Sequence, residues 1–266
     1  MRIAIDHRTR YRFSEPQARL VQLLRLTPQD GADQTVVHWS IGVDCDARLR
    51  EGRDGFGNRV TMLYAVGPIQ HLEVHVTGEV LTAEGHGIVG GAGEPLPPIL
   101  FRRASDRAAP TPPIVAFAQA HAGGDPIARL HALNLAVNAR FAAVPEHHDS
   151  GRTAADLFAS GGAASPRDLA HLFIACARSV TVPARYVSGY RADGAEALPA
   201  PHAWAEAHVD GVGWIAFDPS RGVCTDETYV RVAAGLDAAT AAPVAGSRLG
   251  EGEEALDVEL HVQRQG

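Results

Sequence analysis

The stretch at residues 165–219 reads SPRDLAHLFIACARSVTVPARYVSGYRADGAEALPAPHAWAEAHVDGVGWIAFDP, and it decides the fold. After Pro183 its pattern is that of a strand, and two more strands are expected at residues 202–209 and 214–218. Asp210-Gly211-Val212-Gly213 between them is a strong turn signal. The first part predicts a helix, because apolar residues recur at helical spacing: Leu169, Leu172, Phe173, Cys176 and Ala177.

The start of that helix has a complete set of capping signals. Ser165 is suited to be the N-cap, Pro166 to the first helical position, and Asp168 follows the cap by three residues. Cys176 falls ten residues into the helix on its apolar side, which is typical of a small core residue.

PARYVSGY at residues 183–190 and HAWAEAHVDGVGWIAFDPS at 202–220 resemble the core of the bacterial transglutaminase-like superfamily, whose fold is similar to that of papain-type cysteine proteases. The resemblance implies a catalytic Cys opening the helix, a His opening a strand and an Asp closing the next strand. His202 and Asp218 match the last two. The family pattern Gly-x-Cys-x-Asp-x-Ala-His, anchored on Asp168-Leu169-Ala170-His171, places Pro166 where the nucleophile belongs.

Residues 1–84 alternate with a period of two between turn signals, which predicts a β-sandwich-like module. HRTRYRF (7–13), LLRLTPQD (23–30) and RDGFGNRV (53–60) resemble the N-terminal domain of bacterial transglutaminase-like proteins. We therefore expect an α+β protein in four parts: an N-terminal β-domain at 1–90, a linker at 91–113, a papain/transglutaminase-like core with a central helix and an antiparallel sheet at 114–235, and C-terminal strands completing the fold at 236–266.

Smaller elements follow from local signals. The Gly- and Pro-rich residues 85–113 predict a surface crossing. Helices are expected at 114–121, at 125–141 with Asp125 before Pro126 as its start, and at 154–159. Strands are expected at 229–232 and 256–263, where apolar and polar residues alternate.

Bulk composition excludes several classes. Hydrophobic residues make up 45% and charged residues 21% of 266, as in an ordinary globular protein. A net charge of −7 without a basic stripe argues against nucleic-acid binding, and no apolar run reaches membrane length. Three cysteines without pairing spacing, and a start without a signal-peptide core, lead us to expect a cytoplasmic protein. The oligomeric state stays open.

A cysteine nucleophile belongs at a helix N-terminus because the unpaired backbone donors there favour the thiolate. Pro166 has no thiol and so cannot serve as this nucleophile. Ser165 is a weak substitute, since capping occupies its hydroxyl and a helix dipole cannot ionise an alcohol at neutral pH. The position of Cys176 is typical of a core residue. Cys224 lies on a turn after Asp218 and could approach His202, but no helix begins beside it.

The number of residues in the loop between the two expected strands decides whether His202 and Asp218 can meet. His202 and Asp218 are sixteen residues apart, so a two- or four-residue loop would put them on opposite faces of the sheet. A three-residue loop at 210–212 would pair Trp204 with Asp218 and set His202 diagonal to it on one face.

Two further features bear on the site. His147-His148-Asp149 has no third ligand at helical spacing, so we expect a solvated loop, no metal and no cofactor. Where the family usually has Gly-Arg-Asp-Tyr, this chain has Gly235-Leu236-Asp237-Ala238, a second departure close to the implied active site.

Two functions remain. In the first, the chain is a non-catalytic homologue, a pseudoenzyme whose cleft binds a peptide or protein partner. In the second, it is an active amidase, peptidase or acyl transferase that uses a displaced nucleophile with the His202–Asp218 pair. The absent cysteine favours the first.

Overall fold

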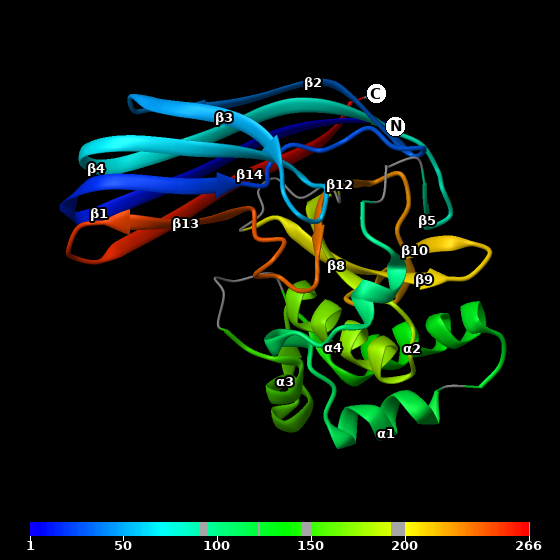
Figure 1. Ribbon diagram of the computed structural model, residues 1–266. Coiled ribbons are helices and arrows are strands. Elements are labelled where there is room, and N and C mark those ends of the chain that lie inside the picture. Colours follow the sequence, from blue (N-terminus) through cyan, green and yellow to red (C-terminus); the bar gives the residue numbers. More distant parts are fainter. Residues whose placement is uncertain (91–94, 122, 145–150, 193–199, 266) are drawn as a thin grey trace.

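The computed structural model describes residues 1–90, 95–121, 123–144, 151–192 and 200–265, and Figure 1 shows that they form two lobes. Long strands from both ends of the chain build one lobe. A smaller sheet with helices on one side builds the other. The predicted α+β class is confirmed.

The strand-rich lobe is built on two long strands, β1 (Arg2–Leu24) and β4 (Arg59–Thr82), which pair antiparallel along most of their length. β2 (Gln34–Val43) and β3 (Ala47–Arg53) both pair with β4, so all four strands belong to one curved sheet. Alternate side chains point inward and form its core: Tyr11, Phe13, Leu20, Leu24, Leu26, Leu63, Ala65, Ile69, Leu72, Val74 and Val76. The N-terminal module is strand-rich, as the period of two predicted. Its strands belong to one sheet, so the sandwich-like arrangement that we expected is not confirmed.

The end of the chain returns to this sheet. β13 (Val244–Leu249) pairs with the second half of β1, and β14 (Glu254–Gln265) pairs with the first half. The strand predicted at 256–263 is therefore present and longer. Because β4 occupies only one edge of β1, the C-terminal strands cover the other edge, and they complete the N-terminal sheet rather than the core sheet.

The predicted crossing at 85–113 contains short elements. β5 (Ile88–Val89) adds to the edge of the core sheet, and two 3-10 turns follow, η1 (Pro98–Arg102) and η2 (Asp106–Ala108). Phe101 of η1 is buried and meets Trp214 edge-on at 5.2 Å between ring centroids. The crossing is thus packed onto the core, which its Gly and Pro content did not reveal.

The core sheet has the order β11-β10-β9-β8-β12, with antiparallel neighbours. Its strands are β8 (Ala184–Arg191), β9 (His202–Val209), β10 (Gly213–Asp218), β11 (Val223–Cys224) and β12 (Tyr229–Gly235). Both strands of the predicted hairpin and the strand predicted at 229–232 are present. This sheet carries the residues matched to the family site.

One face of the core sheet is covered by helices (Figure 1). α1 (Pro112–Ala120), α2 (Pro126–Arg140) and α3 (Ala154–Ser160) surround α4 (Pro166–Ser179), which packs directly on β8 and β9. All four helices were predicted. The Asp125 side chain caps α2, as its position before Pro126 indicated.

The first turn of α4 is fixed by the predicted capping box. The Ser165 hydroxyl accepts from the Asp168 amide at 3.2 Å, and the Ser165 amide donates to the Asp168 carboxylate at 3.3 Å. The preceding β7 (Ala163–Ala164) pairs in parallel with β6 (Ala142–Ala143). The N-terminus of α4 is therefore held on both sides, and its position is well defined.

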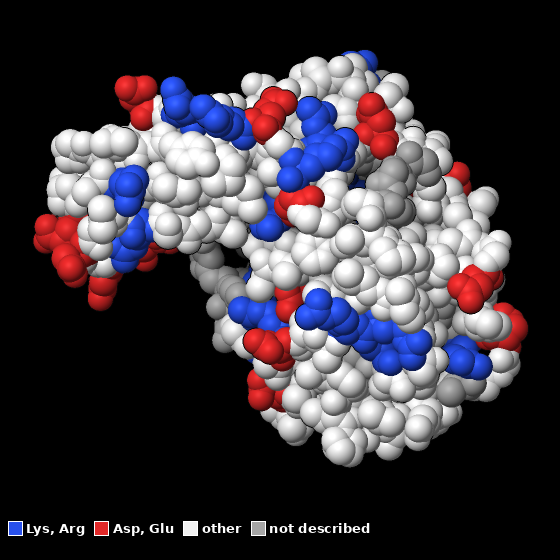
Figure 2. Space-filling model, in the orientation of Figure 1, with Lys and Arg blue, Asp and Glu red and all other residues white. Residues whose placement is uncertain are grey.

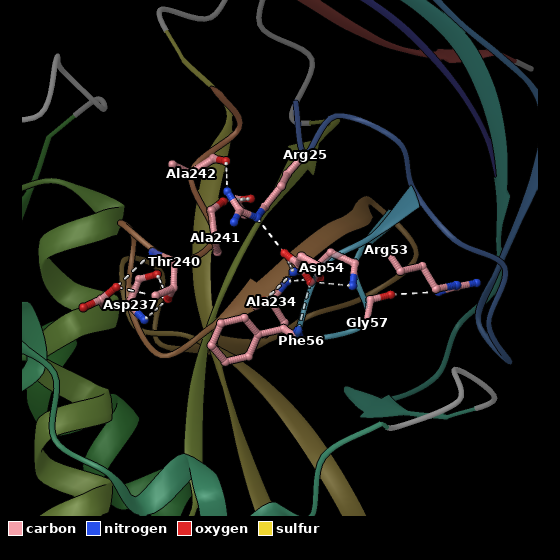
Figure 3. A network of polar contacts seen from close by, with 12 residues as sticks. Arg25, Arg53, Asp54, Phe56, Gly57, Ala234, Asp237, Thr240, Ala241 and Ala242 are labelled. Carbon is pink, nitrogen blue, oxygen red and sulfur yellow. Dashed lines mark hydrogen bonds and ion pairs between the residues drawn. The ribbon is translucent and has the colours of Figure 1, made fainter. Parts of the chain in front are cut away.

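The two lobes are joined by a polar network at the turn between β3 and β4 (Figure 3). Arg25 donates to Asp54 at 2.7 Å and to the Ala242 carbonyl at 3.4 Å. The Asn58 side chain exchanges two hydrogen bonds of 2.8 Å with the backbone of Ala234 on β12. Because these partners come from both lobes, the RDGFGNRV stretch positions the strand-rich lobe against the core.

Surface charge is mixed in sign on the face that Figure 2 shows. The chain contains no lysine, so all basic side chains in that view are arginines. An acyl transfer to an amine could therefore not use a lysine side chain of this sequence, so an assay of such transfer must supply an amine.

A buried histidine also joins the lobes. His7 of β1 is 2% exposed; its Nδ1 lies 3.0 Å from the Tyr190 hydroxyl of β8, and its Nε2 lies 3.2 Å from the Thr9 hydroxyl. Burial lowers the pKa of His7 from 6.5 to about 4. The imidazole is neutral in the folded protein near pH 7.

We predict that His7→Gln weakens the acid sensitivity of folding. The unfolded chain takes up the His7 proton near pH 6.5 and the folded chain only near pH 4. The contribution of neutral His7 to the free energy of unfolding is therefore complete above pH 6.5. It falls by about 3 kcal/mol as the pH drops to 4. Denaturant unfolding at a series of pH values should show a shallower loss for His7→Gln than for the wild type. His86→Gln, at an exposed site, is the control; equal slopes for His7→Gln and the wild type would contradict this assignment.

Candidate functional site

The hairpin of β9 and β10 brings the two matched residues together. Its loop is Asp210–Val212, and the register pairs Val209 with Gly213 and Ala205 with Phe217. This is the three-residue loop that the parity argument required. His202 Nε2 lies 2.7 Å from Asp218 Oδ2, so the predicted contact between the two side chains is present.

Asp218 is fully buried and surrounded by donors. The Ser220 amide and hydroxyl donate to Oδ1 at 3.0 and 2.6 Å, and the Tyr229 hydroxyl donates to Oδ2 at 2.8 Å. Burial alone would raise the pKa of Asp218, but these donors and His202 hold it below its usual value. The carboxylate is ionised and fixed, which is what an orienting acid requires.

The ionised carboxylate determines the tautomer of His202. Because Asp218 can only accept, Nε2 carries the proton of the neutral ring, and Nδ1 keeps its lone pair. Among the residues that the structure describes, no hydrogen bond involves Nδ1. His202 is therefore prepared to accept a proton at Nδ1, which is the role of a general base.

Aromatic rings and an arginine support this pair. The His202 ring stacks on Trp204 at 6.2 Å between centroids and meets Tyr229 at 5.8 Å. Arg221 donates to the Tyr229 hydroxyl at 3.1 Å, which orients that hydroxyl toward Asp218. Sequence reasoning missed Tyr229, because nothing in its spacing marks it. Ser220 could have been found, since a Ser two residues after an Asp commonly forms a local turn.

The position matched to the nucleophile holds the buried ring of Pro166, the first residue of α4. Arg167, the next residue, and Pro201, which precedes β9, line the same cavity. The start of the helix and the start of the His202 strand thus lie at the same end of the core. Proline brings neither a thiol nor an amide hydrogen to that place.

The substitute nucleophiles do not reach His202 through a hydrogen bond in the described part of the chain. The Ser165 hydroxyl caps α4, as predicted. Cys176 is fully buried in the core, and burial raises its thiol pKa to about 12. Burial also raises the pKa of Cys224 on β11 and of Cys45 in the strand-rich lobe. None of the three thiols is activated.

A buried ion triad lies on the same sheet, and the sequence argument did not find it. Glu206 accepts from Arg185 on β8 at 2.5 Å and from Arg231 on β12 at 2.7 Å. Burial alone would raise the pKa of Glu206, yet the two arginines hold it at about 2. The signal was available: in HAWAE, His202, Trp204 and Glu206 alternate onto one face, and Arg185 is the cross-strand partner of Glu206.

Two other sequence features can be placed. The Ala238 amide donates to His171 Nε2 of α4 at 3.0 Å, so the segment that departs from the family pattern does lie against the central helix. Leu236 contributes its carbonyl to the buried Arg178 side chain at 2.7 Å. His147-His148-Asp149 lies outside the described residues.

A helix, an adjoining histidine strand and an aspartate on the next strand define a cysteine-protease-like architecture. Residues 3–81 match the bacterial transglutaminase-like N-terminal region, and residues 115–219 match the transglutaminase-like superfamily. The core of the chain is thus similar to the transglutaminase-like superfamily, and its strand-rich lobe is similar to the N-terminal region of the bacterial members.

Two relatives extend over the whole chain. An uncharacterized protein of Mycobacterium leprae is 27% identical over 291 residues, with 99% of each chain covered. A solved structure from Cytophaga hutchinsonii, described as a candidate cysteine protease, has a TM-score of 0.76 and 21% identity and covers 100% of this chain and 92% of its own. This second likeness establishes the shared two-lobe fold.

Proposed function

We propose that this chain is a non-catalytic transglutaminase-like protein whose retained cleft binds a peptide or protein partner. One observation carries the proposal: the first position of α4, where the family places its cysteine, is the buried ring of Pro166. Acyl transfer by this fold needs a thiolate in that place, and proline has no ionisable group.

The surroundings support the proposal. The hydroxyl of Ser165 is occupied as a cap, and the three thiols have raised pKa values. A nucleophile needs hydrogen-bond contact with its base or a lowered pKa, and neither is found among the described residues.

One observation favours the second function. The hydrogen bond between His202 and Asp218 is short and buried, and Ser220 and Tyr229 also donate to Asp218. Burying a carboxylate costs free energy, so a chain without use for this pair would not be expected to keep it. An active amidase, peptidase or acyl transferase with a displaced nucleophile would use this pair as base and orienting acid.

We predict that the purified protein neither hydrolyses amides nor transfers acyl groups. A panel of peptide amides should release no ammonia or amine, and a glutamine peptide with an added primary amine should give no conjugate. The added amine is necessary because the chain has no lysine.

His202→Ala is the matched control. Any background release should be the same in the wild type and in this variant, since it does not pass through the site. Turnover that the wild type shows and His202→Ala lacks would establish the enzyme and end the non-catalytic proposal.

A further inference from the structure

A cavity of about 270 Å³ lies between the lobes beside the N-terminus of α4. One wall comes from β1 and β14 of the strand-rich lobe, and the other from Tyr186, Arg167 and the segment that joins β12 to β13. Figure 1 shows this segment, in orange, between the strand-rich lobe and the helices. The volume is well above the roughly 10–15 Å³ that one water needs, so the cavity has room for a small organic molecule.

The cavity exists because its core wall is made of small side chains. Ala238, Ala239, Ala241 and Ala242 line it in succession, so this segment fills little of the space that it borders. On the opposite wall, Val258 and Leu256 of β14 add apolar side chains next to His7, Thr9 and Tyr11 of β1. Such walls favour a ligand with an apolar body.

Among the described residues that line the cavity, the charged side chains are all positive. Arg107 of η2 and Arg167 of α4 line it, and none of the described lining residues is acidic. Both arginines also interact elsewhere in the chain, but a guanidinium has five N–H donors and can take a carboxylate in addition. His7 and Thr9 hydrogen-bond to each other, and His7 also to Tyr190, so the inner wall presents no charge.

We propose that this cavity binds a small carboxylate with an apolar body, either a free acid or the apolar C-terminal residue of a peptide. Arg107 and Arg167 hold the carboxylate, and the alanine segment and β14 surround the body. This inference rests on the binding function proposed above. It locates the binding site between the two lobes, beside the start of α4 and the start of β9.

The first test is calorimetric titration with 3-phenylpropanoate and with its neutral amide. The acid should bind at least about tenfold more tightly than the amide, since a charge-assisted pair with arginine is lost in the amide. Arg167→Gln and Arg107→Gln should each lower the affinity for the acid by about tenfold or more. Arg48→Gln, at an exposed position of β3, should not. Equal affinity for acid and amide would overturn the proposal.

The second test fills the cavity. Val258→Trp places a large ring inside from a strand that tolerates aromatics, and it should abolish binding of the acid. Leu249→Trp, on the exposed side of β13, is the matched control and should bind normally. Leu256→Trp serves if the melting curve of Val258→Trp shows misfolding. Wild-type affinity in a folded cavity-filled variant would contradict the assignment.

Two peptide arms identify the source of the carboxylate. A peptide ending in leucine that binds more tightly than N-acetyl-leucine, and loses binding when amidated, identifies a C-terminus; equal affinities identify a free acid. The amide also keeps the two proposals apart. Its hydrolysis by the protein would refute the non-catalytic function, whereas failure of the acid to bind would refute only the cavity assignment.

Discussion

Replacing Glu206 with glutamine should lower the free energy of unfolding by about 3–5 kcal/mol. Glu206 is 0% exposed and accepts from Arg185, itself 2% exposed, and from Arg231. The change removes the carboxylate that the two arginines share, while the Arg185 charge stays buried and the Arg231 charge stays partly buried. Arg185 also lies over the Trp214 ring, 3.8 Å from its centroid, so it cannot move to water without exposing that packing.

The effect should reach the contact between the lobes. Gln34 of β2 donates to the Arg231 carbonyl and accepts from the Arg231 amide, both at 2.9 Å, so displacing Arg231 disturbs a link between the sheets. Urea unfolding measures the change. Glu73→Gln removes a partly exposed pair with Arg10 and should be within about 1 kcal/mol of the wild type. A similarly small loss for Glu206→Gln would mean that the triad does not stabilise the fold.

The second large effect is expected at residue 166. Pro166→Cys should fold, because a proline at the first helical position lacks an N–H that the helix does not use. Ser165 and Asp168 keep the capping box. The new thiol should then have a pKa below the ~8.5 of free cysteine, since the helix N-terminus favours the thiolate. The Asp168 carboxylate opposes this to a degree, although Arg152 lies 3.8 Å from it.

Acidity alone does not restore catalysis. Ala238 and Leu236 contact α4 in the segment where the resemblance implies Tyr and Arg, so we expect the surroundings of the thiol to differ from those of an active member. We therefore expect a reactive thiol without efficient amide hydrolysis. Brief alkylation of Pro166→Cys near pH 7, followed by mass spectrometry, should place the label on the introduced thiol, with Cys176 and Cys224 unlabelled.

Local signals were sufficient for most of the fold. The capping residues of α2 and α4, the period of two along β1 and the turn at Asp210–Val212 each act within a few residues, so the sequence displays them directly. Long-range pairing is different. No local sequence signal predicts that β14 pairs with β1 or that β5 pairs with β10. Each pairing depends on which sheet edge the rest of the chain leaves open.

The same division holds for the site. The contact of His202 with Asp218 could be predicted because loop parity ties two strands of one hairpin. Tyr229, eleven residues beyond Asp218 and across the sheet, could not, and neither could Arg231 as a partner of Glu206. Such contacts arise when separate strands meet, and they depend on the register of the whole sheet.

We infer that Pro166 replaces a nucleophile opposite the His202–Asp218 pair. Titrating the ultraviolet absorbance of the thiolate in Pro166→Cys, and in the double variant Pro166→Cys, His202→Ala, tests it most directly. If His202 faces the start of α4, the thiol of the single variant should be clearly the more acidic, because an imidazolium beside it stabilises the thiolate. Equal thiol pKa values in the two variants would contradict the account, since His202 would then not face this helix end.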